Sequence, residues 1–156
     1  MRYYYFFTLS YHLDSFIGHA LTKPRKDFGE MFLHHYITLI LIIFSYMCNF
    51  ITTGALTLFL HDLAEIFVAI CRIFIDLKRG KTIVILSYVG MVVTWAITRC
   101  YIFPLFIIIP MHSSAMKYEA HYNNYLMTGL ACTLVVLHYY WLGLFIKIGY
   151  HLIVHK

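Results

Sequence analysis

Two pairs of polar residues stand in a stretch of sequence that is otherwise apolar. His34 and His35 lie near one end of the stretch and His61 and Asp62 lie at the other, with no Asp, Glu, Lys or Arg from Met31 to His61. Such a stretch belongs in lipid, where polar side chains are costly and usually functional. An uncharged imidazole in a low-dielectric cavity can act as a general base or a nucleophile, and a nearby carboxylate can fix its tautomer.

Helical spacing indicates which of these side chains can meet. Neighbouring residues on a helix lie ~100° apart, so His34 and His35 do not point at the same spot. His34 shares its face with Asp27, Thr38 and Ser45, which predicts that this face looks into a bundle. In the next apolar stretch His61, Glu65 and Arg72 align on one face, and Asp62 lies on a neighbouring one.

Three interpretations of these residues compete. They can form an interior hydrogen-bond network that holds helices together. They can bind a metal ion, but ligands on a helix are usually spaced i, i+3 or i, i+4, which the adjacent His34 and His35 do not provide, so we predict no metal site. The third interpretation is transfer of an acyl group by an activated imidazole.

The composition sets the environment. The chain has 156 residues, of which 62% are hydrophobic and 12% are charged, and its mean hydropathy is +0.75. A soluble domain carries about twice this charged fraction, so the sequence predicts an integral membrane protein. The net charge of +5 is spread over short loops rather than along a stripe, and we therefore predict no nucleic-acid partner.

The fold predicted from the apolar stretches is an all-α, polytopic transmembrane bundle with about five spans. The spans are expected at about residues 3–21, 28–51, 55–77, 82–116 and 124–146. Thr52, Thr53 and Gly54 are the predicted turn between the second and third spans. Residues 82–116 are too few for two spans and a turn, which favours one long helix, kinked at Pro104 or Pro110 or tilted.

Loop charge predicts the orientation. With five spans, one side holds Lys23, Arg25, Lys26, Lys78, Arg79, Lys81, Lys147 and Lys156, and the other holds Arg2 and Lys117. The positive-inside rule then makes the C-terminus cytosolic. Five spans that begin outside look incomplete, so we expect further spans upstream or from a partner, and we leave open whether the protein forms a homo- or hetero-oligomer.

The stretch at 27–72 resembles the Lag1 motif of ceramide synthases, in the TLC (TRAM–Lag1–CLN8) family. The resemblance rests on Lys26-Asp27-Phe28-Gly29, Met31-Phe32-Leu33-His34-His35, Thr38, Ser45-Tyr46, Asn49, Gly54, Leu56 and His61-Asp62. Further on, Thr98-Arg99 with Ile102-Phe103-Pro104 resembles the family's penultimate helix, and Trp141 with Ile146-Lys147-Ile148 its last one. The likeness covers nearly the whole chain, as a single, partial TLC-type membrane domain at 1–156.

The resemblance implies a fold and an activity. Ceramide synthases are endoplasmic-reticulum enzymes that transfer a fatty acyl group from acyl-CoA to the amine of a sphingoid base, with no cofactor besides this co-substrate. Their seven spans make the five predicted here the third to seventh. The resemblance implies a catalytic pair at His34 and His35 and a supporting motif at His61 and Asp62, with Glu65 where the family usually has a second Asp.

The candidate catalytic residues are therefore His34, His35, His61, Asp62 and Glu65, and the candidate substrate contacts are Asp27, Thr38, Ser45, Asn49, Arg72 and Arg99. For Arg99 an ion pair with Asp14 is the favoured alternative, because an unpaired guanidinium in lipid is costly. The remaining histidines are predicted to be interfacial or packing residues: His12, His19, His112, His121, His138, His151 and His155.

Two matters stay open at this level. A straight hairpin that turns near Thr53 places His34 and His61 at depths that differ by ~15 Å, so the carboxylate that orients the imidazole is uncertain. The function is predicted to be N-acylation of a sphingoid base. The alternatives are a non-enzymatic TLC-type membrane protein that binds lipid or assists translocation, and an inactive fragment.

Overall fold

The structure is a computed structural model that describes residues 2–21, 28–77, 81–117 and 122–154, and nearly all of these are helical. The elements are α1 (Arg2–Leu21), α2 (Phe28–Met47), α3 (Ile51–Asp76), α4 (Lys81–Trp95), η1 (Ala96–Ile102), η2 (Pro104–Ile108), α5 (Ile109–Lys117) and α6 (Tyr122–Val154). No strand occurs in this described part of the chain. The prediction of an all-α polytopic bundle is confirmed.

Four stretches are long and apolar enough to cross a membrane. They are Phe28–Met47, Ile51–Phe74, Thr82–Ser113 and Tyr122–His151. Helix α1 has 20 residues, also enough for a crossing, but its His and Asp side chains make it more polar than these four. The chain is therefore a multi-pass membrane protein, with α1 as the predicted first span.

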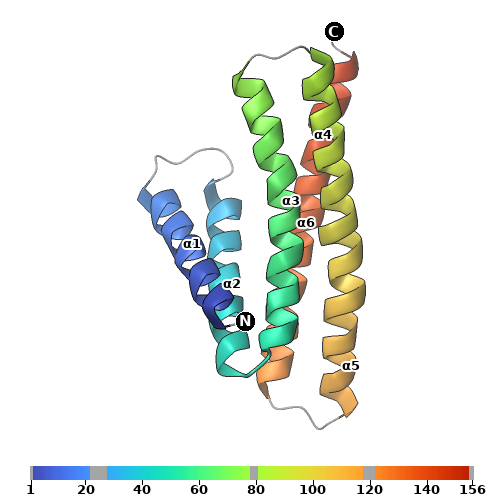
Figure 1. Cartoon of the computed structure of the whole chain (residues 1–156). Coiled ribbons are helices and arrows are strands. Elements are labelled where there is room, and N and C mark those ends of the chain that lie inside the picture. Colours follow the sequence, from blue (N-terminus) through green and yellow to red (C-terminus); the bar gives the residue numbers. More distant parts are fainter. Residues whose placement is uncertain (1, 22–27, 78–80, 118–121, 155–156) are drawn as a thin grey trace.

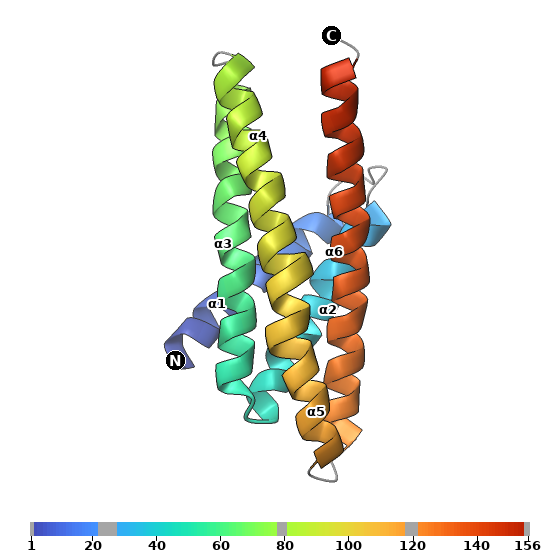
Figure 2. The ribbon, with the colours of Figure 1, turned by 90° about the vertical axis from the view of Figure 1, so that its right-hand side faces the viewer.

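The region from 82 to 116 is one continuous helix, as predicted. The segments α4, η1, η2 and α5 follow each other along a single axis in Figure 2. The middle of this long helix, from Ala96 to Ile108, winds in wider π-helical turns interrupted only at Phe103. Pro104 begins η2, and a proline supplies no N–H to the hydrogen-bond ladder and so favours such a local rearrangement.

The predicted turn at Thr52–Gly54 is wrong, because α3 already begins at Ile51. The chain turns at 48–50, where Asn49 has a φ of 61°. Asn tolerates this left-handed conformation better than most residues. The shift brings His34 level with about Ala64, so the depth difference from His61 falls from ~15 Å to ~5 Å.

Gly54 lies inside α3 at the closest approach of α1. The hydroxyl of Tyr5 occupies the place where a Cβ at position 54 would be. This hydroxyl donates to the Ile51 carbonyl oxygen (3.2 Å) and shares a hydrogen bond with Ser45 Oγ (3.1 Å). The absence of a side chain at Gly54 therefore lets α1 contact both α2 and α3.

The helices form two unequal groups (Figure 1). Helices α1 and α2 lie side by side as a shorter pair, next to the longer α3, α6 and the helix from α4 to α5. The C-terminus and the α3–α4 connection are at one end, and the α2–α3 turn and the α5–α6 connection are at the other. Because α2 packs against both α3 and α6, the face that carries His34 looks into the bundle.

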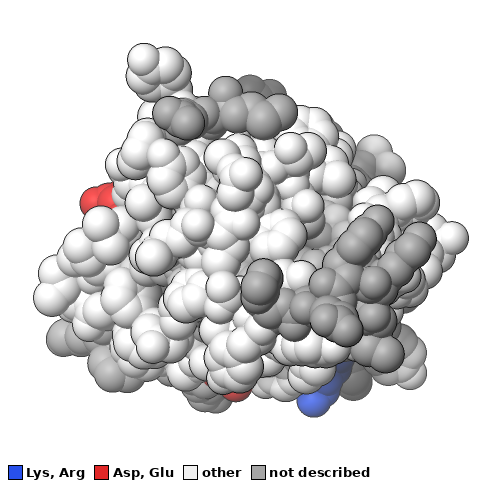
Figure 3. Space-filling model, turned by 90° about the horizontal axis from the view of Figure 1, so that it is seen from below, with Lys and Arg blue, Asp and Glu red and all other residues white. Residues whose placement is uncertain are grey.

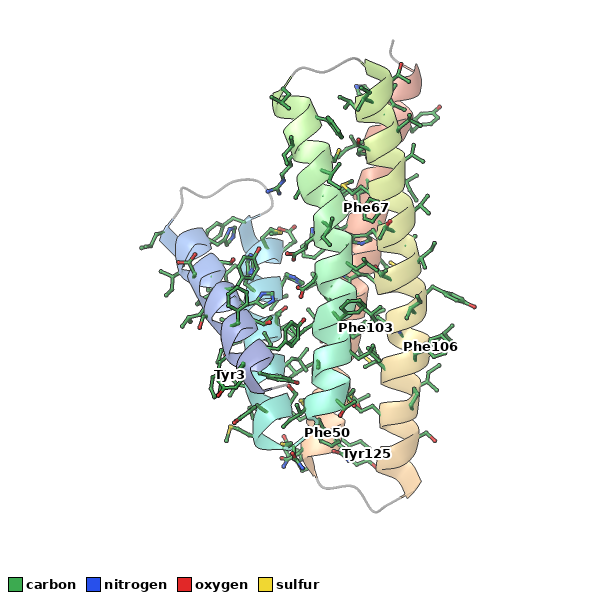
Figure 4. All side chains as sticks on the ribbon, viewed as in Figure 1. Tyr3, Phe50, Phe67, Phe103, Phe106 and Tyr125 are labelled. Atoms are coloured by element: carbon green, nitrogen blue, oxygen red, sulfur yellow. The ribbon has the colours of Figure 1, made fainter. Side chains whose placement is uncertain are left out.

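Apolar side chains cover the outside as well as the core. On the long helix, Phe103 lies against α3 and is 1% exposed, whereas Phe106 points outward and is 65% exposed (Figure 4). Seen from the end with the α2–α3 turn, Lys, Arg, Asp and Glu occupy only small areas of the described surface (Figure 3). The outward-facing apolar side chains along the helices, of which Phe106 is one, match lipid rather than water.

The left-handed turn at Asn49 makes a testable prediction. Asn49→Val should lower the free energy of unfolding by about 1–2 kcal/mol, because a β-branched residue is strained at this φ. Asn49→Gly should keep the stability of the parent, since glycine adopts this conformation freely. Thermal unfolding in detergent measures both, and equal melting temperatures for the Val and Gly variants would contradict the assignment of the turn.

Candidate functional site

Three histidines from three helices meet in the interior. His34 comes from α2, His61 from α3 and His138 from α6, and none is more than 8% exposed. The Nε2 atoms of His61 and His138 lie 3.0 Å apart, at hydrogen-bond distance. The ring of His34 stands edge-on to that of His138, with 5.7 Å between the centroids.

Neighbouring groups fix these rings in place. The Nδ1–H group of His61 donates to the Thr57 carbonyl oxygen at 2.8 Å. Trp95 Nε1–H donates to the backbone carbonyl of His138 at 3.3 Å. Trp141, one turn after His138, places its ring against His34 with a centroid distance of 5.1 Å. The cluster is therefore held by the same side chains that form the core.

Arg99 joins the long helix to α3. Its guanidinium is stacked 4.0 Å above the ring of Trp95 and donates to the His61 carbonyl oxygen at 3.0 Å. Its charge is matched by Glu65, at 3.7 Å. The predicted partner Asp14 is wrong, because that side chain is exposed on α1. The other part of that prediction holds, since this buried guanidinium does pair with a carboxylate.

A partly open cavity lies beside the histidines, with about 700 Å³ of empty space when the space at its open side is included. His12, His34, Thr38, His61 and Glu65 border it at one end, and it extends towards the α2–α3 turn. Its walls beyond the histidines are mainly apolar and include Phe103, Ile107, Met111, Met127 and Leu134. This shape, polar at one end and mainly apolar along its length, suits a molecule with a reactive head and a hydrocarbon chain.

Five of the sequence-predicted residues border this cavity: His34, Thr38, Ser45, His61 and Glu65. His35 does not. It is half-buried, and its ring lies between those of His34 and His19, 5.7 Å and 5.6 Å away between centroids. Asp62 accepts a hydrogen bond from the Tyr4 hydroxyl at 2.9 Å instead of orienting an imidazole.

The other predicted substrate contacts lie apart from the cavity. Asn49 forms the α2–α3 turn, and Arg72 is exposed on α3. Arg99 contacts His61 and Trp95 but does not itself border the cavity. Asp27 lies outside the described residues, and so does most of the loop before α6.

Two histidines that the sequence assigned to interfacial or packing positions belong to the site. His138 is fully buried, and His12 borders the cavity with 6% exposure. Helical spacing places Trp141 on the same face as His138, at i+3, but does not say which other helix this face meets. Among the described residues, no three His, Cys, Asp or Glu side chains converge as metal ligands would.

The contacts of Arg99 make a prediction about stability. Arg99→Met should lower the free energy of unfolding by about 1.5–3 kcal/mol, because it removes a charge-assisted hydrogen bond from a buried site. Arg72→Met is the matched control, since Arg72 is exposed on the helix that carries His61. Thermal unfolding of both variants in one detergent tests this, and equal losses would contradict the role given to Arg99.

Comparisons with known proteins identify the family of the chain. A family model described as the TLC domain matches residues 1–147. Ceramide synthase LOH2 of Arabidopsis thaliana is 31% identical over 130 residues, which cover 78% of this chain and 43% of that protein. Ceramide synthase 4 of Homo sapiens is 26% identical over 151 residues, which cover 96% of this chain and 38% of that protein. Ceramide synthase 1 LOH3 of Arabidopsis thaliana is 28% identical over 146 residues, which cover 88% of this chain and 47% of that protein. The chain spans less than half the length of these curated relatives. It belongs to the TLC-domain family, in the Lag1-type group that the ceramide synthases form.

Proposed function

We propose that this protein transfers a fatty acyl group from acyl-CoA to the amine of a sphingoid base and so forms a ceramide or dihydroceramide. One observation carries the proposal: the imidazole of His34, 8% exposed, borders a mainly apolar cavity within the membrane-spanning part of the chain. The names of the relatives in plants and animals support the same reaction.

His34 performs the central step in this proposal. Acting as a general base, it takes a proton from the attacking amine while the new C–N bond forms at the thioester carbonyl carbon. The C–S bond then breaks, and the imidazolium returns this proton to the leaving thiolate. Because the thioester already activates the acyl group, the reaction requires no cofactor besides acyl-CoA itself.

A covalent route uses the same atoms. The His34 ring attacks the thioester carbon through its bare nitrogen, the C–S bond breaks, and the ring's own proton passes to the leaving thiolate, so that the acyl group rests on an uncharged ring. The amine then attacks this acyl-imidazole, the bond to the ring breaks, and one proton passes from the amine to the ring. Intact-mass measurement after incubation with acyl-CoA alone separates the two routes, since only the covalent route adds the mass of an acyl group.

In this proposal the cavity holds the acyl-CoA beside His34. The acyl chain lies along the apolar wall towards Met111 and Met127, and Thr38, one turn along α2 from His34, provides a polar contact near the reacting head. His34 is ~9 Å along α2 from Phe28, so the CoA head group remains in water at the end of the bundle where the basic loops lie. In this proposal that end is cytosolic, the C-terminus is cytosolic, and the membrane is the endoplasmic reticulum.

The non-enzymatic alternative makes a different demand on the site. A protein that only binds or helps to move lipid needs the cavity but has no use for an imidazole on its wall. The cluster of His34, His61 and His138 favours the enzyme, because each buried imidazole costs free energy that an apolar side chain would not. An inactive fragment is the other alternative, and the assay below addresses it.

The purified protein should make ceramide from a long-chain base and acyl-CoA, and His34→Ala should lower the rate at least about 100-fold. His112→Ala is the control, because His112 is exposed on α5 and should leave the rate unchanged. His35→Ala should retain more activity than His34→Ala, since His35 does not border the cavity. No product from the unaltered protein, or equal rates for the His34 and His112 variants, would contradict the proposed function.

A further inference from the structure

The hydrogen bonds of the histidine cluster determine its proton positions. The Thr57 carbonyl oxygen can only accept, so the Nδ1 atom of His61 must carry a proton to donate to it at 2.8 Å. An uncharged imidazole has one ring proton, and its Nε2 is then a bare acceptor. In the 3.0 Å bond between the two Nε2 atoms, His138 must therefore be the donor.

This assignment leaves one lone pair of His138 unused. With its proton on Nε2, the Nδ1 atom of His138 is an acceptor, and it is buried without a hydrogen-bond partner. The Nδ1 atom of His34 is also buried without a partner. A buried polar atom without a partner is uncommon and calls for an explanation.

The two unpartnered atoms belong to neighbouring rings. The centroids of His34 and His138 are 5.7 Å apart, compared with 5.0 Å for the hydrogen-bonded pair of His61 and His138. The difference is 0.7 Å. The two rings are therefore neighbours, and catalytic hydrogen bonds are often long in unliganded proteins and tighten when the substrate is bound.

We propose that His138 is a positioning residue for His34. In the loaded enzyme, Nδ1 of His138 accepts the Nδ1–H of His34, which leaves the Nε2 lone pair of His34 free for the reaction. The chain of bonds then runs from the Thr57 carbonyl through His61 and His138 to His34. His138 does this without touching substrate, since it does not border the cavity. The catalytic role of His138 rests on the proposed function. The proton positions of His61 and His138 do not depend on it.

The surroundings of His138 support a positioning role over plain packing. Its exposure is 0%, and its ring contacts those of Trp95, Phe103 and Trp141. An apolar residue would fill this place without the cost of burying two ring nitrogens. The place of the carboxylate in a hydrolase triad is thus taken by a second, uncharged imidazole, which can orient His34 without adding a charge inside the membrane.

Nitrogen NMR tests the proton positions without any need for activity. In protein labelled with ¹⁵N-histidine, protonated and bare ring nitrogens have well-separated chemical shifts. We expect His61 to be protonated at Nδ1 and His138 at Nε2, assigned with His61→Gln and His138→Gln. A His138 ring protonated at Nδ1, or one that carries two protons, would overturn the proposal.

Steady-state kinetics test the catalytic role. His138→Phe keeps a flat aromatic ring, larger by one ring atom, but removes both nitrogens, and should lower kcat about 100-fold while KM for both substrates stays close to that of the parent. His138→Gln offers an amide donor and a carbonyl acceptor, and its kcat should be at least about tenfold higher than that of His138→Phe. His112→Phe is the matched control and should leave kcat unchanged.

The outcomes separate the two proposals. Full activity of a folded His138→Phe variant overturns the positioning role. Equal losses of kcat in the Phe and Gln variants, together with lowered melting temperatures, also overturn it, because they indicate that His138 serves packing alone. If the unaltered protein makes no ceramide, the proposed function fails, and the catalytic role given to His138 fails with it. The NMR spectrum still shows in that case whether the proton positions are right.

Discussion

The hydrogen bond between His61 and His138 is the constraint on which the interior of this protein depends. Inside a bilayer no water is present to satisfy a polar group, so each ring nitrogen needs a partner within the protein. The 3.0 Å bond ties α3 to α6 at one point, and Arg99 ties the long helix to the backbone at that same point. Three of the membrane-spanning helices thus meet at one polar cluster, around which the apolar side chains pack.

The cavity follows from this arrangement and from the turn at Asn49. Once α3 is held against α6, a short turn brings α2 alongside both, with His34 on the inner face. The π-helical segment of the long helix directs Phe103 and Ile107 into the same space. Close contact of α1 over Gly54 then adds His12 to the wall. The fold therefore places a polar cluster at one end of a mainly apolar space, which is the requirement for handling a lipid with a reactive head.

The sequence predicted the elements better than it predicted their contacts. Apolar run length is a strong signal, so the four long spans and the single helix from 82 to 116 were predicted from it. The turn was placed four residues too late, because Gly54 looked like a turn residue and is instead a point of close helix contact. That error alone accounts for most of the predicted depth difference between His34 and His61.

Helical spacing predicted only part of the site. His34, Thr38, Ser45, His61 and Glu65 lie on faces that helical spacing identifies, and all border the cavity. His138 and His12 come from other helices, and no local pattern says which distant helix face meets α3. The pairing of Arg99 with Glu65 rather than Asp14 is likewise a tertiary contact. Residue spacing within one helix cannot predict it.

The central claim is that the cavity beside His34 holds the acyl chain of the substrate. The most direct measurement is photo-crosslinking with a long-chain acyl-CoA that carries a diazirine at the end of its chain, followed by peptide mapping. We expect labels on residues that border the far end of the cavity, above all Met111 and Met127, and loss of these labels when unmodified acyl-CoA competes. Labels confined to outward-facing residues such as Phe106 and Phe7, with no effect of the competitor, would contradict it.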